Sequence, residues 1–294
     1  MLRALAFCLA FVSISSQAAR GPASAPLQLR YGVAAFGSVN PVRSLDTLAA
    51  LGFDYIEPAL SQLVALDPDA LASARAKIAA SRVHVETMNW FLPGTDIKLT
   101  GPKVDNADVR GYVEKSLALA ESFGAKVIVF GSPGARTVPD GFPHDKAWEQ
   151  LKEFLRTCGD VIQAHNYGMV IGIEALRKPE TNIVNSVAEA LKLAREVNHP
   201  KIRIIVDFYH LAFEHEDPNV ILGGRDMIVH LQIADPRDRT FPVSDAGEPR
   251  YRAFFANLRK IGYNGRISIE ANSDNVGADA KASLAFLKKM AAAD

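Results

Sequence analysis

The chain has 294 residues, of which 48% are hydrophobic and 22% are charged, enough apolar material for one large buried core. Its 33 Lys and Arg residues balance 33 Asp and Glu residues. A chain without net charge has no long-range field that attracts nucleic acid or an anionic membrane, so we expect neither as a partner.

The N-terminus is typical of a secretory signal peptide. Arg3 precedes the apolar run Ala4–Ile14, and small residues up to Ala18 and Ala19 suit a signal-peptidase site. The run is too short to span a bilayer, and a buried N-terminal helix is the alternative. We therefore expect export to the periplasm or the medium, without membrane insertion of the mature protein. The predicted segments are a signal peptide (1–19), a flexible lead-in (20–28) and one domain (29–294).

The two cysteines do not predict a disulfide. Cys8 lies in the expected signal peptide, which leaves Cys158 without an intramolecular partner in the mature chain. Cys158 falls in an amphipathic helical stretch, where we expect it to be a small core residue.

From residue 29 onward, short β-rich runs alternate with longer stretches of helical periodicity. The predicted strands are Leu29–Phe36, Tyr55–Pro58, His84–Asn89, Lys126–Phe130, Val170–Glu174, Ile202–Asp207, Ile228–Ile233 and Arg266–Glu270. The predicted helices are Leu45–Leu51, Asp69–Ser81, Asp108–Phe123, Lys146–His165, Val187–Val197, Asn219–Asp226, Tyr251–Ile261 and Ala278–Met290, and the periodicity is weakest in Asn219–Asp226.

Eight such alternations favour a closed (β/α)₈ TIM barrel. A doubly wound sheet is the alternative, but the sequence has no GxGxxG or phosphate-loop motif to support it. Glycines follow several helices, where a left-handed conformation can end them: Gly52, Gly124, Gly168 and Gly262.

Four consecutive predicted strands end in polar residues, although buried parallel strands are normally apolar. These residues are Glu174 on the fifth strand, Asp207 on the sixth with His210 soon after, His230, Gln232 and Asp235 on the seventh, and Glu270 on the eighth. In TIM barrels, the carboxyl ends of the strands carry the active site. We therefore expect these side chains to converge on one half of the barrel mouth.

Carboxylates gathered in one place repel one another unless a cation compensates their charge. An oxygen-rich set formed by Glu174, Asp207, Gln232 and Glu270 suits one Mn²⁺ or Mg²⁺ ion. Each residue alone also has a structural interpretation: Asp207 can cap the next helix, and His210 can be a structural histidine.

Four segments carry a family resemblance that spans nearly the whole mature chain. They are Glu174–Glu180, Asp207–His210, His230–Asp235 and Tyr263–Glu270. Together they resemble the xylose isomerase-like barrel superfamily of sugar phosphate isomerases and epimerases, and in particular ketose 3-epimerases. Gln232 stands where the epimerases usually have His, and this departure resembles hydroxypyruvate isomerase-like proteins.

The resemblance implies roles for individual residues. Glu174, Asp207, Gln232 and Glu270 would bind the metal, with His230 as an alternative ligand. His210 and Glu180 would hydrogen-bond the substrate. Arg237 and Arg239 both lie near the position of the family's substrate arginine, and our candidate for that role is Arg239. Position alone, apart from the resemblance, makes Glu57, Asn89 and Trp90 candidates to line the pocket, because they end the second and third strands. Trp90 and Phe91, and Phe36 near the end of the first strand, are candidates for an apolar wall; ordinary packing at the rim is the alternative interpretation.

The resulting hypothesis is an exported, metal-dependent sugar isomerase or epimerase. Glu174 and Glu270 would face each other across the substrate, one removing a proton beside a carbonyl and the other returning it through an enediolate. Export favours an unphosphorylated keto-sugar, sugar derivative or cyclitol.

Three alternatives use the same barrel. A lyase or hydratase acting on 3-keto-glycosides would share the first step. A non-catalytic sugar-binding barrel would not need two opposed glutamates. An endonuclease-type metal hydrolase would need more His residues than the seven present. Oligomerisation is possible for barrels of this group, but no segment stands out as an interface.

Overall fold

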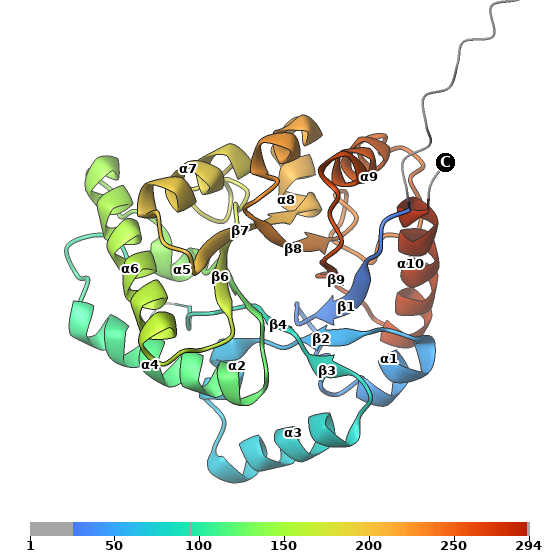
Figure 1. Ribbon diagram of the computed structural model, residues 1–294, viewed down its shortest axis with the longest axis horizontal. Helices are drawn as coiled ribbons and strands as arrows, with labels where there is room; N and C mark the ends of the chain where they lie inside the picture. Colours follow the sequence, from blue (N-terminus) through green and yellow to red (C-terminus); the bar gives the residue numbers. More distant parts are fainter. Residues whose placement is uncertain (1–25, 95, 293–294) are drawn as a thin grey trace, which may run out of the picture.

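The computed structural model describes residues 26–94 and 96–292 (Figure 1). The expected signal peptide (1–19) and most of the lead-in lie outside the described residues. In the described part of the chain, no helix is both long enough and apolar enough to cross a membrane.

Parallel strands form a nearly closed barrel, so the predicted fold class is confirmed. The strands are β1 (Arg30–Ala34), β2 (Tyr55–Glu57), β3 (His84–Val85), β4 (Thr87–Met88), β5 (Val127–Phe130), β6 (Val170–Ile173), β7 (Ile202–Asp207), β8 (Ile228–Ile233) and β9 (Arg266–Ile269). Their order in the sheet is β3-β2-β1-β9-β8-β7-β6-β5-β4.

The predicted third strand is divided at Glu86 into β3 and β4. β3 pairs with β2, whereas β4 pairs with β5. β3 and β4 are the two ends of the sheet, and Glu86 joins them through the chain; its carbonyl accepts a 2.7 Å hydrogen bond from the Lys126 amide, just before β5. Nine observed segments therefore correspond to the eight predicted strands.

Helices surround the barrel (Figure 1). They are α1 (Leu45–Leu51), α2 (Leu60–Val64), α3 (Pro68–Ala80), α4 (Asn106–Ser122), α5 (Pro133–Arg136), α6 (His144–Ala164), α7 (Val187–Val197), α8 (Phe208–Phe213), α9 (Arg250–Ile261) and α10 (Val276–Ala291). The weakly predicted helix Asn219–Asp226 is a 3₁₀ helix, η1 (Pro218–Gly224), preceded by the short α8, which the sequence did not predict.

Local sequence explains where several helices end. Gly52 and Gly262 have φ of 87° and 68° and terminate α1 and α9, as predicted. Gly124 is also left-handed, whereas Gly168 is not: after α6 that conformation is adopted by Asn166. Asn can do so because its short polar side chain bonds the local backbone.

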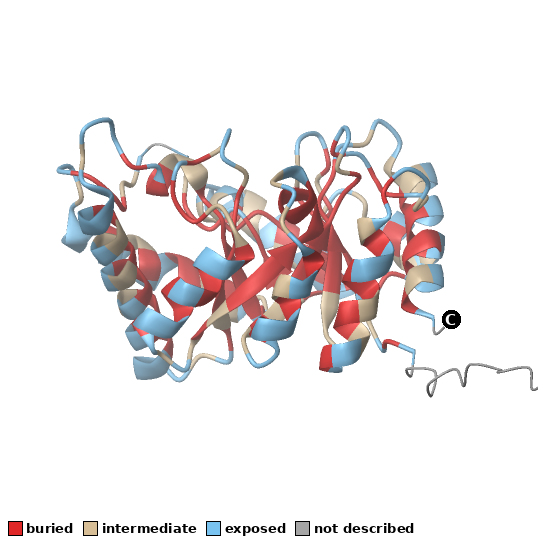
Figure 2. Cartoon of the chain, turned by 90° about the horizontal axis from the view of Figure 1, so that it is seen from above, coloured by how far each residue is buried: buried red, intermediate tan, exposed pale blue. Residues whose placement is uncertain are grey.

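The core lies inside the barrel and between the strands and the helices. Strand residues are almost all buried, while the outer faces of the helices are exposed (Figure 2). Cys158 is a free, fully buried side chain on α6, consistent with a core position. Because both faces of the sheet are covered, a polar side chain inside the barrel is desolvated and requires partners.

A register shift between β7 and β8 matters for the site. Ile204 pairs with Ile228, but the next residue, Ile205, pairs with His230. β8 therefore holds one extra residue at this point. Such a bulge changes which side chains lie level with each other. Here it places Gln232 beside Asp207 at the carboxyl end of the sheet.

Candidate active site

A cavity of about 380 Å³ opens at the carboxyl ends of the strands. Its polar lining residues are Asn89, Ser132, Glu174, Arg177, Glu180, Arg239 and Glu270. Its apolar lining residues include Phe36, Trp90, Leu92, Pro133 and Leu176. A cavity with a few convergent polar groups and an apolar wall is typical of small-molecule sites.

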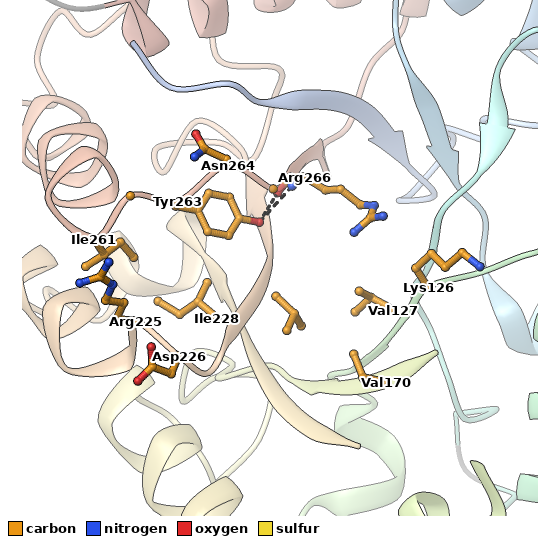
Figure 3. A pocket seen from close by; sticks show the side chains of 13 residues that line it. Lys126, Val127, Val170, Arg225, Asp226, Ile228, Ile261, Tyr263, Asn264 and Arg266 are labelled. Atoms are coloured by element: carbon orange, nitrogen blue, oxygen red, sulfur yellow. Dashed lines mark hydrogen bonds between the residues drawn. The ribbon is translucent and has the colours of Figure 1, made fainter. Parts of the chain in front are cut away.

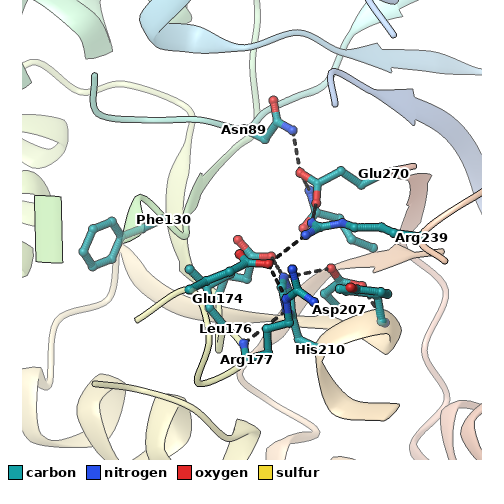
Figure 4. Close-up of polar contacts among 12 residues, drawn as sticks. Asn89, Phe130, Glu174, Leu176, Arg177, Asp207, His210, Arg239 and Glu270 are labelled. Atoms are coloured by element: carbon teal, nitrogen blue, oxygen red, sulfur yellow. Dashed lines mark hydrogen bonds and ion pairs between the residues drawn. The ribbon is translucent and has the colours of Figure 1, made fainter. Parts of the chain in front are cut away.

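Glu174 follows β6 and points into this cavity (Figure 4). Its carboxylate lies against Gly131, where a β-carbon would come within 2.2 Å of Oε2. Its backbone carbonyl accepts a 2.8 Å hydrogen bond from the fully buried Arg136. Burial raises the pKa of Glu174 to about 8, although Arg239 and Arg136 oppose the shift. The carboxyl can therefore exchange a proton near neutral pH.

Asp207 ends β7 and also begins α8. Its Oδ1 accepts a 2.8 Å hydrogen bond from the Tyr209 amide, the helix-capping role that the sequence left open. Oδ2 is buried and has no hydrogen-bond partner among the described residues. Burial raises the pKa of the Asp207 carboxyl, and Glu174 and Glu270 add to that shift while His210 opposes it.

His210 is buried on α8, and its protonation state follows from its contacts. Burial lowers the pKa of His210 to about 4, so the ring is neutral at physiological pH. Nδ1 accepts a 3.2 Å hydrogen bond from the Arg177 amide, which leaves the proton on Nε2. Nε2 lies 3.5 Å from Glu174 Oε1 and 3.5 Å from Asp207 Oδ2. His210 is thus a donor toward the site.

Glu270 follows β9 and enters the cavity from the side opposite His210 (Figure 4). Its Oε1 accepts hydrogen bonds from Asn89 at 2.7 Å and from Gln232 at 3.3 Å. Its Oε2 accepts one from Arg239 at 2.6 Å. Both oxygens of Glu270 therefore have protein donors, unlike Oε1 of Glu174 and Oδ2 of Asp207.

The structure distinguishes between the two candidate arginines. Arg239 is buried, and its guanidinium donates hydrogen bonds to Glu270 at 2.6 Å and to Glu180 at 3.0 Å. The guanidinium carbon of Arg239 also lies over two aromatic rings, 3.9 Å from the ring centroid of Phe36 and 4.5 Å from that of Tyr209. Arg237, by contrast, is 70% exposed and pairs with Asp235 outside the cavity.

Gln232 lies on β8 inside the barrel and is fully buried. Its amide nitrogen donates to Glu57 at 2.8 Å and to Glu270 at 3.3 Å. Its Oε1 has no hydrogen-bond partner within residues 26–94 and 96–292. The predicted alternative ligand, His230, instead bonds Glu57 through Nε2 at 2.8 Å.

Glu57 occupies a different place from the one predicted. It is fully buried beneath the cavity rather than lining it. Burial alone would raise the pKa of Glu57, but His230 and the hydrogen bonds from His230, Ser268 and Thr87 outweigh that effect and hold the pKa below its ordinary value. Glu57 is therefore an ionised carboxylate in the barrel interior.

The pocket wall also differs in part from the prediction. Trp90 lines the cavity at its rim, 47% exposed and with a left-handed φ of 48°. Phe91 instead packs into the core, where its ring centroid lies 5.9 Å from that of Phe154. Tyr209 and Arg136 were not predicted as site residues. Tyr209 adjoins the Asp207–His210 motif, whereas no sequence signal marks Arg136.

The donor set fits a divalent cation. Four buried carboxylate or amide oxygens have no hydrogen-bond partner in the described part of the chain: Asn89 Oδ1, Glu174 Oε1, Asp207 Oδ2 and Gln232 Oε1. The carboxylate oxygens that Glu174 and Asp207 offer lie within 4.8 Å of each other. Buried unpaired oxygens are costly, and a hard cation with oxygen ligands removes that cost.

A second cavity, of about 510 Å³, lies at the opposite end of the barrel (Figure 3). It is lined by residues at the amino ends of the strands, including Lys126, Arg225, Tyr263 and Arg266. The Tyr263 hydroxyl donates to the Arg266 carbonyl at 2.8 Å, and the Arg266 guanidinium binds Glu86. This cavity contains none of the predicted site residues.

Comparison with known proteins shows that the chain is similar to sugar isomerases and epimerases. An L-ribulose 3-epimerase from Methylomonas sp. is 25% identical over 266 residues, which cover 85% of this chain and 87% of that protein. A 2-oxo-tetronate isomerase from Pectobacterium atrosepticum is 29% identical over 56% of this chain, and the match covers 62% of the isomerase. A 3-dehydro-D-guloside 4-epimerase from Escherichia coli is 29% identical over 52% of this chain and 59% of its own length.

Solved structures share the fold. A D-psicose 3-epimerase from Clostridium cellulolyticum has a TM-score of 0.78 at 18% identity, over 90% of this chain and all of that one. A 3-keto-D-glucoside 4-epimerase from E. coli has a TM-score of 0.71 at 22% identity, over 89% of this chain and 99% of that one. The family model described as xylose isomerase-like TIM barrel matches residues 45–290. The chain therefore belongs to the xylose isomerase-like TIM barrel family.

Proposed function

We propose that this protein is a metal-dependent sugar isomerase or epimerase that moves a proton on a carbon beside a carbonyl group. The observation that carries the proposal is one cavity with two buried glutamates, Glu174 and Glu270, and with buried acceptor oxygens that lack donors among the described residues. The relatives support the same reaction class, because their names describe sugar isomerases and epimerases.

Glu174, Asp207 and Gln232 would hold the cation through their unpaired oxygens, and Glu270 remains a predicted fourth ligand. When bound, a divalent cation supplies electrostatic stabilisation of the negative charge that develops on the substrate oxygens. Its charge also relieves the repulsion between the carboxylates.

The two glutamates act on the proton. Both line the cavity, so a substrate between them presents one carbon to Glu174 and Glu270. In the metal-free site burial raises the pKa of each carboxyl, and the charge of a bound cation would lower it again, so that a carboxylate is available to remove a proton at neutral pH. One carboxylate removes the proton, and the other carboxyl returns a proton to the opposite face or to the adjacent carbon.

Three further residues position the substrate. His210 donates from Nε2 toward the carboxylates, at the place where a substrate oxygen would accept. Arg239 and Glu180 form an ion pair on the cavity wall that can bond a vicinal pair of hydroxyls. The apolar wall formed by Phe36, Trp90 and Leu92 suits the carbon face of a sugar ring or a glycosidic substituent.

We further propose an unphosphorylated keto-sugar, sugar derivative or cyclitol as substrate. The proposal rests on the signal-like sequence of residues 1–19, since exported enzymes rarely meet sugar phosphates. Localisation of a tagged full-length chain in cell fractions tests this part. A precursor and a mature form that both remain in the cytoplasm would refute it.

The test is an exchange experiment. Purified protein with Mn²⁺ is incubated in D₂O with a panel of ketoses, keto-glycosides and inososes. We expect deuterium at a carbon beside the carbonyl and a product that is otherwise isomeric with the substrate, both lost on chelation. Loss of water or of a leaving group would identify a lyase instead. No exchange with any member of the panel would refute the proposed chemistry.

A further inference from the structure

A cluster of five polar side chains lies beneath the active-site cavity. Glu57, Thr87, His230, Gln232 and Ser268 are each fully buried inside the barrel. They come from four strands, so the cluster crosses the barrel interior. Four of its members donate to the fifth, Glu57.

The two oxygens of Glu57 have different partners. Oε2 accepts from Thr87 at 2.8 Å, from His230 at 2.8 Å and from Ser268. Oε1 accepts from Gln232 alone, at 2.8 Å. Three donors meet at Oε2, and the contact at Oε1 is made by the amide nitrogen of Gln232. The end of Gln232 that faces Glu57 is therefore its NH₂ group.

The second contact of that NH₂ group fixes the same orientation. It also donates to Oε1 of Glu270 at 3.3 Å, so both of its hydrogens point at carboxylates. Exchanging the amide nitrogen and oxygen would set a carbonyl oxygen against two carboxylate oxygens, which is repulsive. The carbonyl oxygen of Gln232 is consequently the atom left without a donor in the described part of the chain.

We propose that Glu57 is a positioning residue: it orients the side-chain amide of Gln232 so that its carbonyl oxygen, and not its NH₂ group, faces the cation. The inference rests on the metal site of the proposed function. Nε2 of His230 is itself bound to Glu57 and is not available to the cation, whereas its Nδ1 has no hydrogen-bond partner in the described part of the chain. Groups behind the ligands commonly fix ligand orientation in metal sites.

The substitution Glu57→Gln tests the proposal with almost no change in shape. Three donors converge on the position of Oε2, so the new carbonyl oxygen would stay there and the new NH₂ group would face Gln232. Gln232 would then turn over and present N–H groups to the cation. We expect the dissociation constant for Mn²⁺, measured from the electron paramagnetic resonance signal of free Mn²⁺, to rise by about tenfold to a hundredfold.

A double variant distinguishes a change in the orientation of residue 232 from a general loss of structure. In Glu57→Gln combined with Gln232→Glu, the amide donates and the carboxylate accepts, so the hydrogen bond returns with its roles exchanged. The second carboxylate oxygen would face the cation. We expect this double variant to recover most of the lost Mn²⁺ affinity. Failure to recover any affinity, with the protein folded, would overturn the proposal.

Thr87→Val is the matched control. It removes one donor to Oε2 of Glu57 but leaves the contact between Oε1 and Gln232. We expect lower thermal stability of the metal-free protein and Mn²⁺ affinity close to that of the wild type. An equal loss of affinity in Thr87→Val and Glu57→Gln would show that the cluster acts only through stability, and would overturn the proposal.

Glu57→Asp serves if Glu57→Gln does not fold. It keeps the charge, but the shorter side chain cannot reach both His230 and Gln232, so Mn²⁺ affinity should again fall. Unchanged affinity in either folded variant, with a wild type that binds Mn²⁺ and turns over substrate, would refute this inference alone. A wild type that does not bind Mn²⁺ would refute both this inference and the metal site of the proposed function.

Discussion

The two ends of the barrel differ in whether their carboxylates have partners. At the amino end, Glu86 lies between Arg30 and Arg266 and forms an ion pair with each. At the carboxyl end, Glu174 and Asp207 are buried more deeply, and each keeps one oxygen without a partner among the described residues. The cavity at the amino end is the larger, at about 510 Å³ against about 380 Å³.

Cavity size therefore does not locate the active site in this barrel. An ion cluster with satisfied partners adds modest stability at a partly exposed position. Unpaired buried oxygens cost stability, and proteins retain them where a ligand or a reaction needs them. The comparison predicts that substitutions at the carboxyl end change chemistry, whereas those at the amino end change only stability.

The largest effect is expected from the two glutamates. Glu174→Gln and Glu270→Gln should each lower kcat by roughly a thousandfold, because an amide cannot take or return the proton. Circular dichroism should show an intact fold. Glu86→Gln at the amino end is the control and should retain near-normal kcat. A Glu174→Gln enzyme with near-normal turnover would contradict the assigned role.

A glycine next to Glu174 provides a second test. In Gly131→Ala, the new methyl group would lie 2.2 Å from Oε2 of Glu174 and force that carboxylate to move. We expect Mn²⁺ affinity to fall by about tenfold or more. Gly111→Ala in α4 is the control, because its β-carbon meets nothing within 4 Å among the described residues. The control should gain about 0.5–1 kcal/mol of stability and bind Mn²⁺ normally.

The two candidate arginines permit a paired comparison. Arg239→Ala removes the bonds to Glu180 and Glu270, and we expect kcat/KM to fall by about tenfold or more. Arg237→Ala removes an exposed ion pair and should leave kcat/KM unchanged. Similar losses in both variants, measured on the substrate found by deuterium exchange, would show that the family's arginine was placed incorrectly.

The smallest expected effect is a pH dependence of the metal-free protein. Burial raises the pKa of Glu174 to about 8 and also raises those of Asp207 and Glu270, so between pH 6.5 and 8 the native state binds more protons than the unfolded state. Stability should therefore fall as pH rises through this window, by at most about 1.4 kcal/mol per pH unit and group. His210 partly opposes this trend near pH 6.5, because its pKa is lowered to about 4 and the native ring binds fewer protons than the unfolded one; this opposition fades as pH rises toward 8.

Thermal unfolding at several pH values, with and without Mn²⁺, measures this effect. The ion competes with protons for the same carboxylates, so the increase in Tm that it causes should grow from pH 6.5 to pH 8. Metal-free stability that is constant or rises across this window would contradict the assignment of raised pKa values to these carboxyls.

Much of the barrel could be predicted from the sequence, because each strand and each long helix has a hydrophobic pattern within its own residues. Apolar runs mark the strands, and residues such as Glu174, Asp207 and Glu270 interrupt that pattern at the strand ends. The short α8 and the division of the third strand at Glu86 were missed because each depends on only a few residues.

The arrangement of the site depends on contacts between residues that lie far apart in the sequence. A one-residue shift between β7 and β8 sets Gln232 level with Asp207. The proton on His210 is placed by the backbone amide of Arg177, and the burial of Glu57 depends on three other strands. These features follow from the assembled barrel, so motif spacing alone could not supply them.

The central claim is that the unpaired oxygens at the carboxyl end bind a divalent cation. A crystal of the protein soaked in Mn²⁺, measured at the manganese absorption edge, tests it most directly. We predict one strong anomalous peak within coordination distance of Glu174 Oε1, Asp207 Oδ2 and Gln232 Oε1. The absence of a peak there, with ordered water bonded to the three oxygens instead, would contradict the account.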